Sequence, residues 1–158
     1  MRAGATPKEA LLATAKAWNQ QNLARTYDRP ERTEGVSLRK VRRKKIGRVD
    51  GYDVVLVDGE AVRDHVHIDF TQGGNPARYG YVPKGEIWVE AGRQRKDQAA
   101  TAVHELIETR EMKRGKSYGK AHDVALEREA AMRKRSRGRP KTEAGLLEMI
   151  RRWWSKLK

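Results

Sequence analysis

Two segments near the middle of the chain carry the residues best suited to metal chemistry. His104 and Glu108 are four residues apart, so on a helix both side chains lie on one face and can reach the same ion. In the next segment, His122 and Glu129 are seven apart and share a face, with the small Ala125 between them. Imidazole and carboxylate ligands favour zinc, with iron or manganese as alternatives. We therefore predict a metal site formed by His104, Glu108, His122 and Glu129.

Two further residues fit acid–base and electrostatic roles beside these ligands. Glu105 directly follows His104, as the glutamate that activates water follows the first histidine of an HExxH helix. Tyr118 is a candidate for stabilising an oxyanion. Together these residues predict hydrolysis by a metal-activated water.

Other interpretations of the same residues remain open. Ligation by both histidines and both glutamates would close the site and make it structural rather than catalytic. Glu129 could instead orient His122 from outside the coordination sphere. A dinuclear site using Glu105 and Glu108 would indicate iron or manganese chemistry, and carboxylates that only pair with Lys and Arg would need no metal.

The extended pattern resembles a known family. HExxE followed by M, G, Y and AHxxAxxxE resembles a group of small phage and prophage metallopeptidase-like proteins and, more remotely, compact zincins of the phage-repressor-cleaving type. The resemblance covers roughly residues 50 to 130 and implies a zinc-dependent peptidase with peptide or protein substrates. It also implies that strand 86–90 lines the substrate groove, and it places Glu108 where zincins usually have a second histidine. The matching residues are His104, Glu105, Glu108, Met112, Gly115, Tyr118, Ala121, His122, Ala125 and Glu129, with Gly85 to Glu90 upstream.

Capping signals predict the helices that would hold these ligands. Asp97 can cap the first helix, which places His104 in its second turn. Gly115 follows a basic last turn and is typical of a helix C-terminus, and Ser117 can cap the second helix. Helices joined by so short a turn are expected to pack roughly antiparallel.

The segment before these helices predicts β structure. Tyr52 to Val57 is expected to be a strand, Asp58-Gly59 a hairpin turn, and Ala61 to Phe70 the returning strand. A short strand is predicted at Tyr79 to Val82, and an edge strand at Glu86 to Glu90. In the returning strand, His65 and His67 would share one face and form an alternative metal site, although a solvent-facing position is the simpler expectation.

Composition narrows the class of protein. With 158 residues and 37% hydrophobic residues, one domain with a modest core is expected. The absence of cysteine excludes a disulfide scaffold and thiolate ligands. We find no signal-peptide h-region and no apolar run of membrane-spanning length, and therefore expect a cytoplasmic protein of a bacterium or of a phage-infected host.

The two ends of the chain are expected to be helical appendages. Thr6 to Glu9 form a capping box that predicts a helix over residues 7 to 25. Residues 1–130 are expected to form the zincin-like α+β domain: N-terminal helix, small twisted antiparallel or mixed sheet, and two-helix metal site. Residues 131–158 are expected to be a basic linker and an amphipathic helix, which packs on the domain or self-associates.

The net charge of +14 favours a polyanionic partner. Residues 39–48 form a basic run, expected to be a solvated loop, whose Arg42, Arg43, Lys44 and Lys45 could contact phosphates. Arg137 and Arg139 lie in an Arg-Gly-Arg-Pro sequence like the core of an AT-hook. A nucleic-acid-binding accessory protein is thus the alternative function, and the sequence leaves the oligomeric state open.

Overall fold

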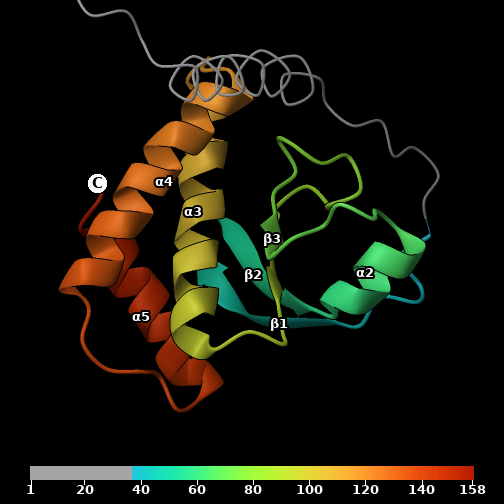
Figure 1. The fold of residues 1–158 in the computed structure, drawn as a ribbon, viewed down its shortest axis with the longest axis horizontal. Helices are drawn as coiled ribbons and strands as arrows, with labels where there is room; N and C mark the ends of the chain where they lie inside the picture. Colours follow the sequence, from blue (N-terminus) through green and yellow to red (C-terminus); the bar gives the residue numbers. More distant parts are fainter. Residues whose placement is uncertain (1–36) are drawn as a thin grey trace, which may run out of the picture.

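The computed structural model describes residues 37–158, and the helix predicted over residues 7 to 25 lies outside them. The described residues confirm the α+β fold, with helices packed on a small mixed sheet (Figure 1). The elements are β1 (Arg43–Val49), β2 (Tyr52–Val57), α2 (Gly59–His65), β3 (Gly73–Gly74), β4 (Glu86–Glu90), α3 (Arg95–Lys113), α4 (Tyr118–Arg135) and α5 (Glu143–Ser155).

The strand order across the sheet is β1-β2-β4-β3. β1 and β2 are antiparallel and joined at Asp50 and Gly51, whose φ angles of 52° and 84° are the positive values that a type I′ hairpin turn requires. The basic run is therefore a strand from Arg43 onward, and the prediction of a solvated loop there was wrong. Its charged side chains suit an edge strand, where they oppose pairing with another chain.

The hairpin predicted at Asp58-Gly59 was also wrong, because Asp58 caps α2. Its carboxylate accepts a hydrogen bond from the backbone nitrogen of Ala61 (3.1 Å), which favours a helix start over a returning strand. The strand predicted over Ala61 to Phe70 is absent from this described segment, and Ile68 within it is 79% exposed. Tyr79 to Val82 forms a turn rather than a strand, with Val82 N bonded to Tyr79 O (3.1 Å).

β4 is confirmed as a strand over Glu86–Glu90, but it is not the edge strand that was predicted. It lies between β2, to which it is parallel, and β3, to which it is antiparallel. Ile87 and Val89 face one core and Trp88 faces the other, as the alternation of the strand requires. Both faces of β4 are therefore covered, and β3 forms the sheet edge on that side.

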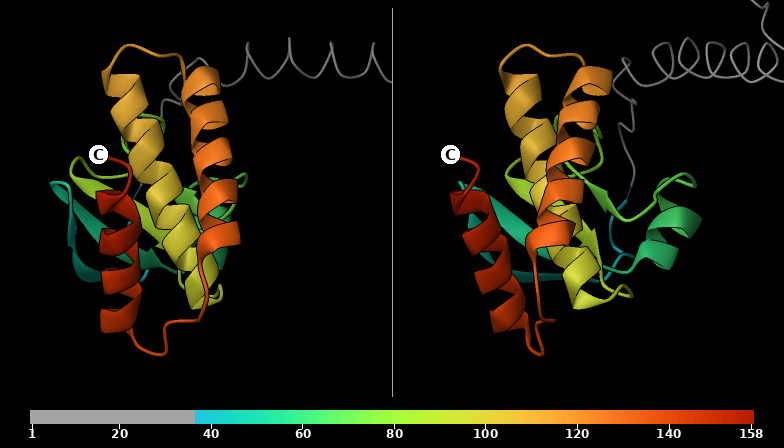
Figure 2. Two further views of the ribbon diagram at one scale, coloured as in Figure 1. Left: turned by 90° about the vertical axis from the view of Figure 1, so that its left-hand side faces the viewer. Right: turned by 60° about the vertical axis from the view of Figure 1, so that its left-hand side comes forward.

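The helices pack on opposite faces of the sheet. α3 lies along one face, α4 and α5 flank α3, and α2 lies on the far side (Figures 1 and 2). The predicted C-terminal amphipathic helix is confirmed as α5, which buries Leu146, Ile150 and Trp153 in the core it shares with α3. Within residues 37–158, we find no helix of sufficient length and apolar character to cross a membrane.

Candidate metal centre

α3 and α4 form the predicted antiparallel hairpin. Gly115 adopts a φ of 92° just past the end of α3, and Ser117 Oγ accepts a hydrogen bond from Lys120 N (3.4 Å) at the start of α4. α3 begins at Arg95 after Gln94, so Asp97 is not its cap and His104 lies in the third turn rather than the second. This helix start leaves the Asp97 carboxylate available for a contact with α4.

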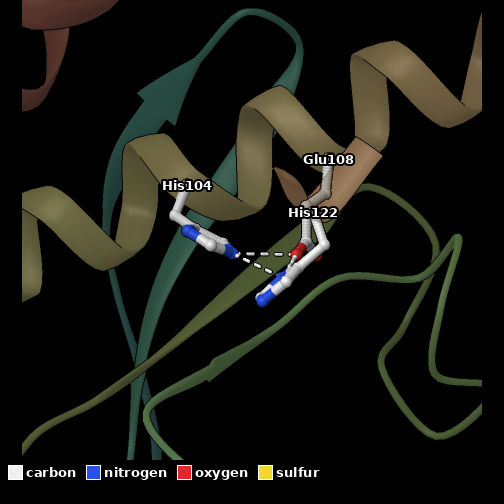
Figure 3. A group of neighbouring side chains, drawn as sticks. All are labelled: His104, Glu108 and His122. Carbon is white, nitrogen blue, oxygen red and sulfur yellow. Dashed lines mark hydrogen bonds and ion pairs between the residues drawn. The ribbon is translucent and has the colours of Figure 1, made fainter. Parts of the chain in front are cut away.

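Three of the four predicted ligands converge at one point between α3 and α4 (Figure 3). His104 Nε2 lies 2.8 Å from Glu108 Oε1 and 3.1 Å from His122 Nδ1, and His122 Nδ1 lies 2.5 Å from Glu108 Oε1. We call these three residues the metal triad. Glu108 is buried, His104 has a side chain only 10% exposed, and His122, at 36%, is the member that faces solvent.

No arrangement of protons gives all three close contacts among His104 Nε2, Glu108 Oε1 and His122 Nδ1 a favourable hydrogen bond. If both histidines donate to Glu108 Oε1, two N–H groups face each other across the 3.1 Å between His104 Nε2 and His122 Nδ1. If only one histidine donates, the other brings a nitrogen lone pair close to a carboxylate oxygen. A cation at the centre removes this conflict, because each of the three atoms can direct a lone pair toward it.

The donor set and its spacing also fit a metal ion. Zinc–ligand bonds of about 2.0 to 2.1 Å at tetrahedral angles place ligand atoms about 3.3 Å apart. The three distances of 2.5 to 3.1 Å are a few tenths of an ångström shorter, so small side-chain movements would accommodate the ion. Three protein ligands would leave a fourth position for water or substrate.

Glu129 lies on the other side of the His104 ring from the triad. Its Oε2 is 2.9 Å from His104 Nδ1, and its Oε1 accepts a hydrogen bond from Arg133 Nε (2.9 Å) and forms an ion pair with Arg133 Nη2 (2.8 Å). Arg133 is in turn paired with Asp97 at 2.5 Å. Glu129 thus orients His104, rather than His122, and a chain of alternating charges links it to the start of α3.

The charges in this cluster stabilise one another strongly. Burial alone would lower the pKa of His104, but its hydrogen bonds to Glu108 and Glu129 outweigh burial and raise the pKa to about 10. Burial alone would raise the pKa of Glu108, but the two histidines hold it below its usual value. The pKa of Glu129 is lowered by its hydrogen bonds to His104 and Arg133. The cluster therefore favours a cation between anionic carboxylates.

Glu105 is held beside the triad by Asn75, a residue that the sequence did not identify. The fully buried Asn75 donates from Nδ2 to Glu105 Oε2 (2.7 Å) and to Glu108 Oε2 (2.9 Å), which places the two carboxylates side by side. Burial and the neighbouring charge of Glu108 raise the pKa of Glu105 to about 8. Asn75 follows the β3 residues Gly73 and Gly74, and a Cβ on Gly73 would lie 2.9 Å from Glu105 Oε1. The close approach of β3 to Glu105 therefore depends on glycine.

Tyr118 is buried at the edge of the cluster, on the first turn of α4. Its ring centroid lies 5.5 Å from that of His122, and the guanidinium of Arg78 lies 4.5 Å from the ring centre of Tyr118. Burial and the nearby Glu108 raise its pKa above the usual value, so its hydroxyl keeps its proton. The Tyr118 ring therefore lies near the triad and carries a protonated hydroxyl.

The alternative pair of histidines does not form a site. His65 is exposed at the end of α2, and the His67 ring stacks on Tyr81 with centroids 5.6 Å apart. In the part of the chain that the structure describes, the metal triad is the group of His, Asp or Glu side chains whose potential ligand atoms all lie within 4.8 Å of one another.

The predicted phosphate-contacting residues lie in two different surroundings. Arg43, Lys44 and Lys45 form ion pairs with Glu86 (3.6 Å), Glu143 (3.0 Å) and Asp53 (2.9 Å) respectively, and Arg42 precedes them. Arg137 and Arg139 are exposed between α4 and α5, where Gly138 has a φ of 88° and turns the chain. This turn differs from the extended conformation in which an AT-hook enters the minor groove.

The comparisons with known proteins give no significant match, whether to family models, to curated proteins or to solved structures.

Proposed function

We propose that this protein is a zinc-dependent hydrolase of the metallopeptidase type, with His104, Glu108 and His122 as the zinc ligands. The observation that supports the proposal is that the four predicted ligands take two different positions. Three converge on one point, while Glu129 is used to orient His104. This supports an ion with an open fourth position, as in catalytic sites, over a closed structural site.

In the proposed mechanism, a zinc ion held by His104, Glu108 and His122 would supply a water acidic enough to ionise near neutral pH and a Lewis acid for the substrate carbonyl. Glu105 takes the proton of the attacking water and returns it to the leaving amine. Its raised pKa of about 8 is close to the value that suits a group working in both directions near neutral pH. Asn75 orients the Glu105 carboxylate, and the protonated Tyr118 supplies a hydrogen bond to the developing oxyanion.

The position of β3 supports an extended peptide as the substrate. β3 is the edge strand on the side of the sheet nearest the triad, and Gly73 lies directly against Glu105. A peptide that adds to this edge as a further strand would run past Glu105 with its amide bonds exposed to the ion. β3, rather than β4, would then position the substrate.

The test compares the wild type with Glu105→Gln, both purified without a metal-affinity tag. We expect about one zinc per chain in both proteins, because Glu105 is not a ligand. Hydrolysis of a mixed peptide library, followed by mass spectrometry, should be about 10² to 10⁴ times slower in Glu105→Gln, which lacks the general base. Zinc in both proteins without peptide cleavage by the wild type would indicate a structural metal site. Two iron or manganese ions per chain would instead favour the dinuclear alternative.

A further inference from the structure

A second charged region lies between α4 and α5, away from the metal triad. The two helices flank α3 (Figure 2). Side chains from both helices and their connection line a groove of about 380 Å³. Its cationic residues are Arg128 and Arg135 on α4, Arg137 in the connection, Arg152 on α5 and Lys156 at the C-terminal cap of α5. We call this the α4–α5 groove. Within residues 37–158, no carboxylate lines the groove.

The five cationic side chains are exposed and have no ion-pair partner among residues 37–158. Five like charges around one concave surface repel one another, and their potentials add in the groove. Such an arrangement is stabilised by a ligand that brings several negative charges at once.

The groove is also structurally fixed. Lys96 donates to the backbone oxygen of Ser136 (3.0 Å), which ties the start of the α4–α5 connection to α3. Trp153 forms part of the groove wall and is only 5% exposed, because it is packed in the core shared by α3 and α5. The cations are thus carried on elements that are anchored to the domain, which reduces the entropic cost of binding.

We propose that the α4–α5 groove binds the phosphate backbone of duplex nucleic acid. Four of its five cations are arginines, whose forked guanidinium groups match phosphate oxygens in a bidentate geometry. Among the described residues, the aromatic side chain that lines the groove is the buried Trp153, which offers no exposed ring on which an unpaired base could stack. These two features favour backbone contacts without base recognition. Binding of this kind is independent of the metal site.

A membrane surface fits the groove less well. A basic helix with two tryptophans can lie on a bilayer, but it must then insert its apolar face. Trp153 and Trp154 of α5 are both buried in the protein core, so this face is already occupied. An acidic peptide remains as the competing polyanion, and the experiment must separate it from nucleic acid.

The experiment measures binding of the full-length protein to a fluorescein-labelled DNA duplex of arbitrary sequence, by anisotropy over a salt series. The groove variant is Arg128→Gln/Arg152→Gln/Lys156→Gln. The control variant, Arg43→Gln/Lys44→Gln/Lys45→Gln, removes the same charge from cations that are ion-paired on β1. Circular dichroism of both variants verifies the fold.

We expect wild-type binding to weaken steeply with salt. Because each phosphate contact contributes about 0.9 to the slope of log K against log salt, the groove variant should reduce that slope by about 3, and the control by less than about 1. Equal changes in both variants would show that binding follows net charge alone and would overturn the proposal. So would groove-dependent binding of poly-glutamate or of anionic vesicles without binding of the duplex, or no duplex binding by the wild type at low salt.

Discussion

The metal triad and the α4–α5 groove both use residues of α4, but the triad contains buried, paired charges and the groove contains exposed cations. In the triad, His104 and Glu108 are buried in direct contact, and each shifts the pKa of the other toward the charged form. In the groove, cations such as Arg128 and Arg135 are exposed and make no ion pair in the described part of the chain. The triad is therefore suited to one small ion held by a few short bonds, whereas the groove is suited to an extended polyanion. One helix can serve both because different α4 residues belong to the triad and to the groove.

The largest expected effect is that of His122→Ala, which should abolish zinc binding without changing DNA binding. This change removes one of three candidate ligands but leaves the groove cations in place, and we expect the fold to tolerate it because the His122 side chain is partly exposed. We expect bound zinc to fall from about one per chain to a trace, measured by mass spectrometry after gel filtration, with unchanged affinity for duplex DNA. A parallel loss of DNA binding would contradict the independence of the two regions.

Glu129→Gln should weaken the site without abolishing it. The amide keeps the shape of the side chain but loses the negative charge that holds His104 Nδ1 and pairs with Arg133. Loss of such an orienting partner typically lowers metal affinity about 10- to 100-fold. Competition with a zinc chelator measures the change, and an unaltered zinc affinity would show that Glu129 does not act on the metal through His104.

The zinc affinity is expected to rise about tenfold for each unit of pH below the pKa of His104. With a pKa of about 10 in the metal-free protein, His104 is protonated at neutral pH, and its Nε2 must lose that proton to bind zinc. Zinc affinity should therefore rise as pH rises toward 10, with about one proton released per ion from His104. Calorimetry in buffers of different ionisation enthalpy counts these protons, and zero release would contradict a protonated His104.

The opposite sign is expected for the stability of the metal-free fold. The folded-state pKa of His104 is raised above its ordinary value of 6.5, so its stabilising contribution is fully present below pH 6.5 and is lost as pH rises toward 10. Zinc-loaded protein should lack this loss, because the ion replaces the proton. Thermal unfolding with and without a chelator between these pH values distinguishes the two forms.

The smallest expected effect is that of Gly47→Ala on the groove side. A Cβ at Gly47 would lie 2.2 Å from Leu147 Cδ2, so the Leu147 side chain would have to move, and we expect this to displace α5 slightly from β1. We expect a loss of about 1 to 2 kcal/mol in the free energy of unfolding, typical of overpacking. DNA affinity should fall a few-fold because α5 shifts, with zinc affinity unchanged. An equal loss of zinc affinity would show that the strain reaches α3.

The helical hairpin could be predicted from the sequence because its determinants are local. Gly115 and Ser117 define the turn between α3 and α4, and the spacing of His104 and Glu108 places both on one helix face. The core-facing alternation of β4 and the packing of α5 were predictable from their apolar patterns for the same reason.

The elements that the sequence misassigned depend on distant residues. β1 lacks a clear apolar alternation, and it forms by pairing with β2 while its cations pair with acids such as Asp53 and Glu143. Asn75 lies in a turn 30 residues before Glu105, and no local pattern distinguishes it from other turn residues. The orienting role of Glu129 toward His104 also required the relative rotation of the two helices, which spacing does not determine.

The different origins of these residues have a consequence for folding kinetics. His104, Glu108 and His122 all belong to one helical hairpin closed by a short turn, and local contacts of this kind form rapidly. Asn75 reaches Glu105 only after β3 has paired with β4, which requires closure of a much longer loop. We therefore expect the nascent chain to capture its ion before Glu105 is oriented, so that a partly folded molecule is loaded with metal but not yet reactive toward neighbouring polypeptides.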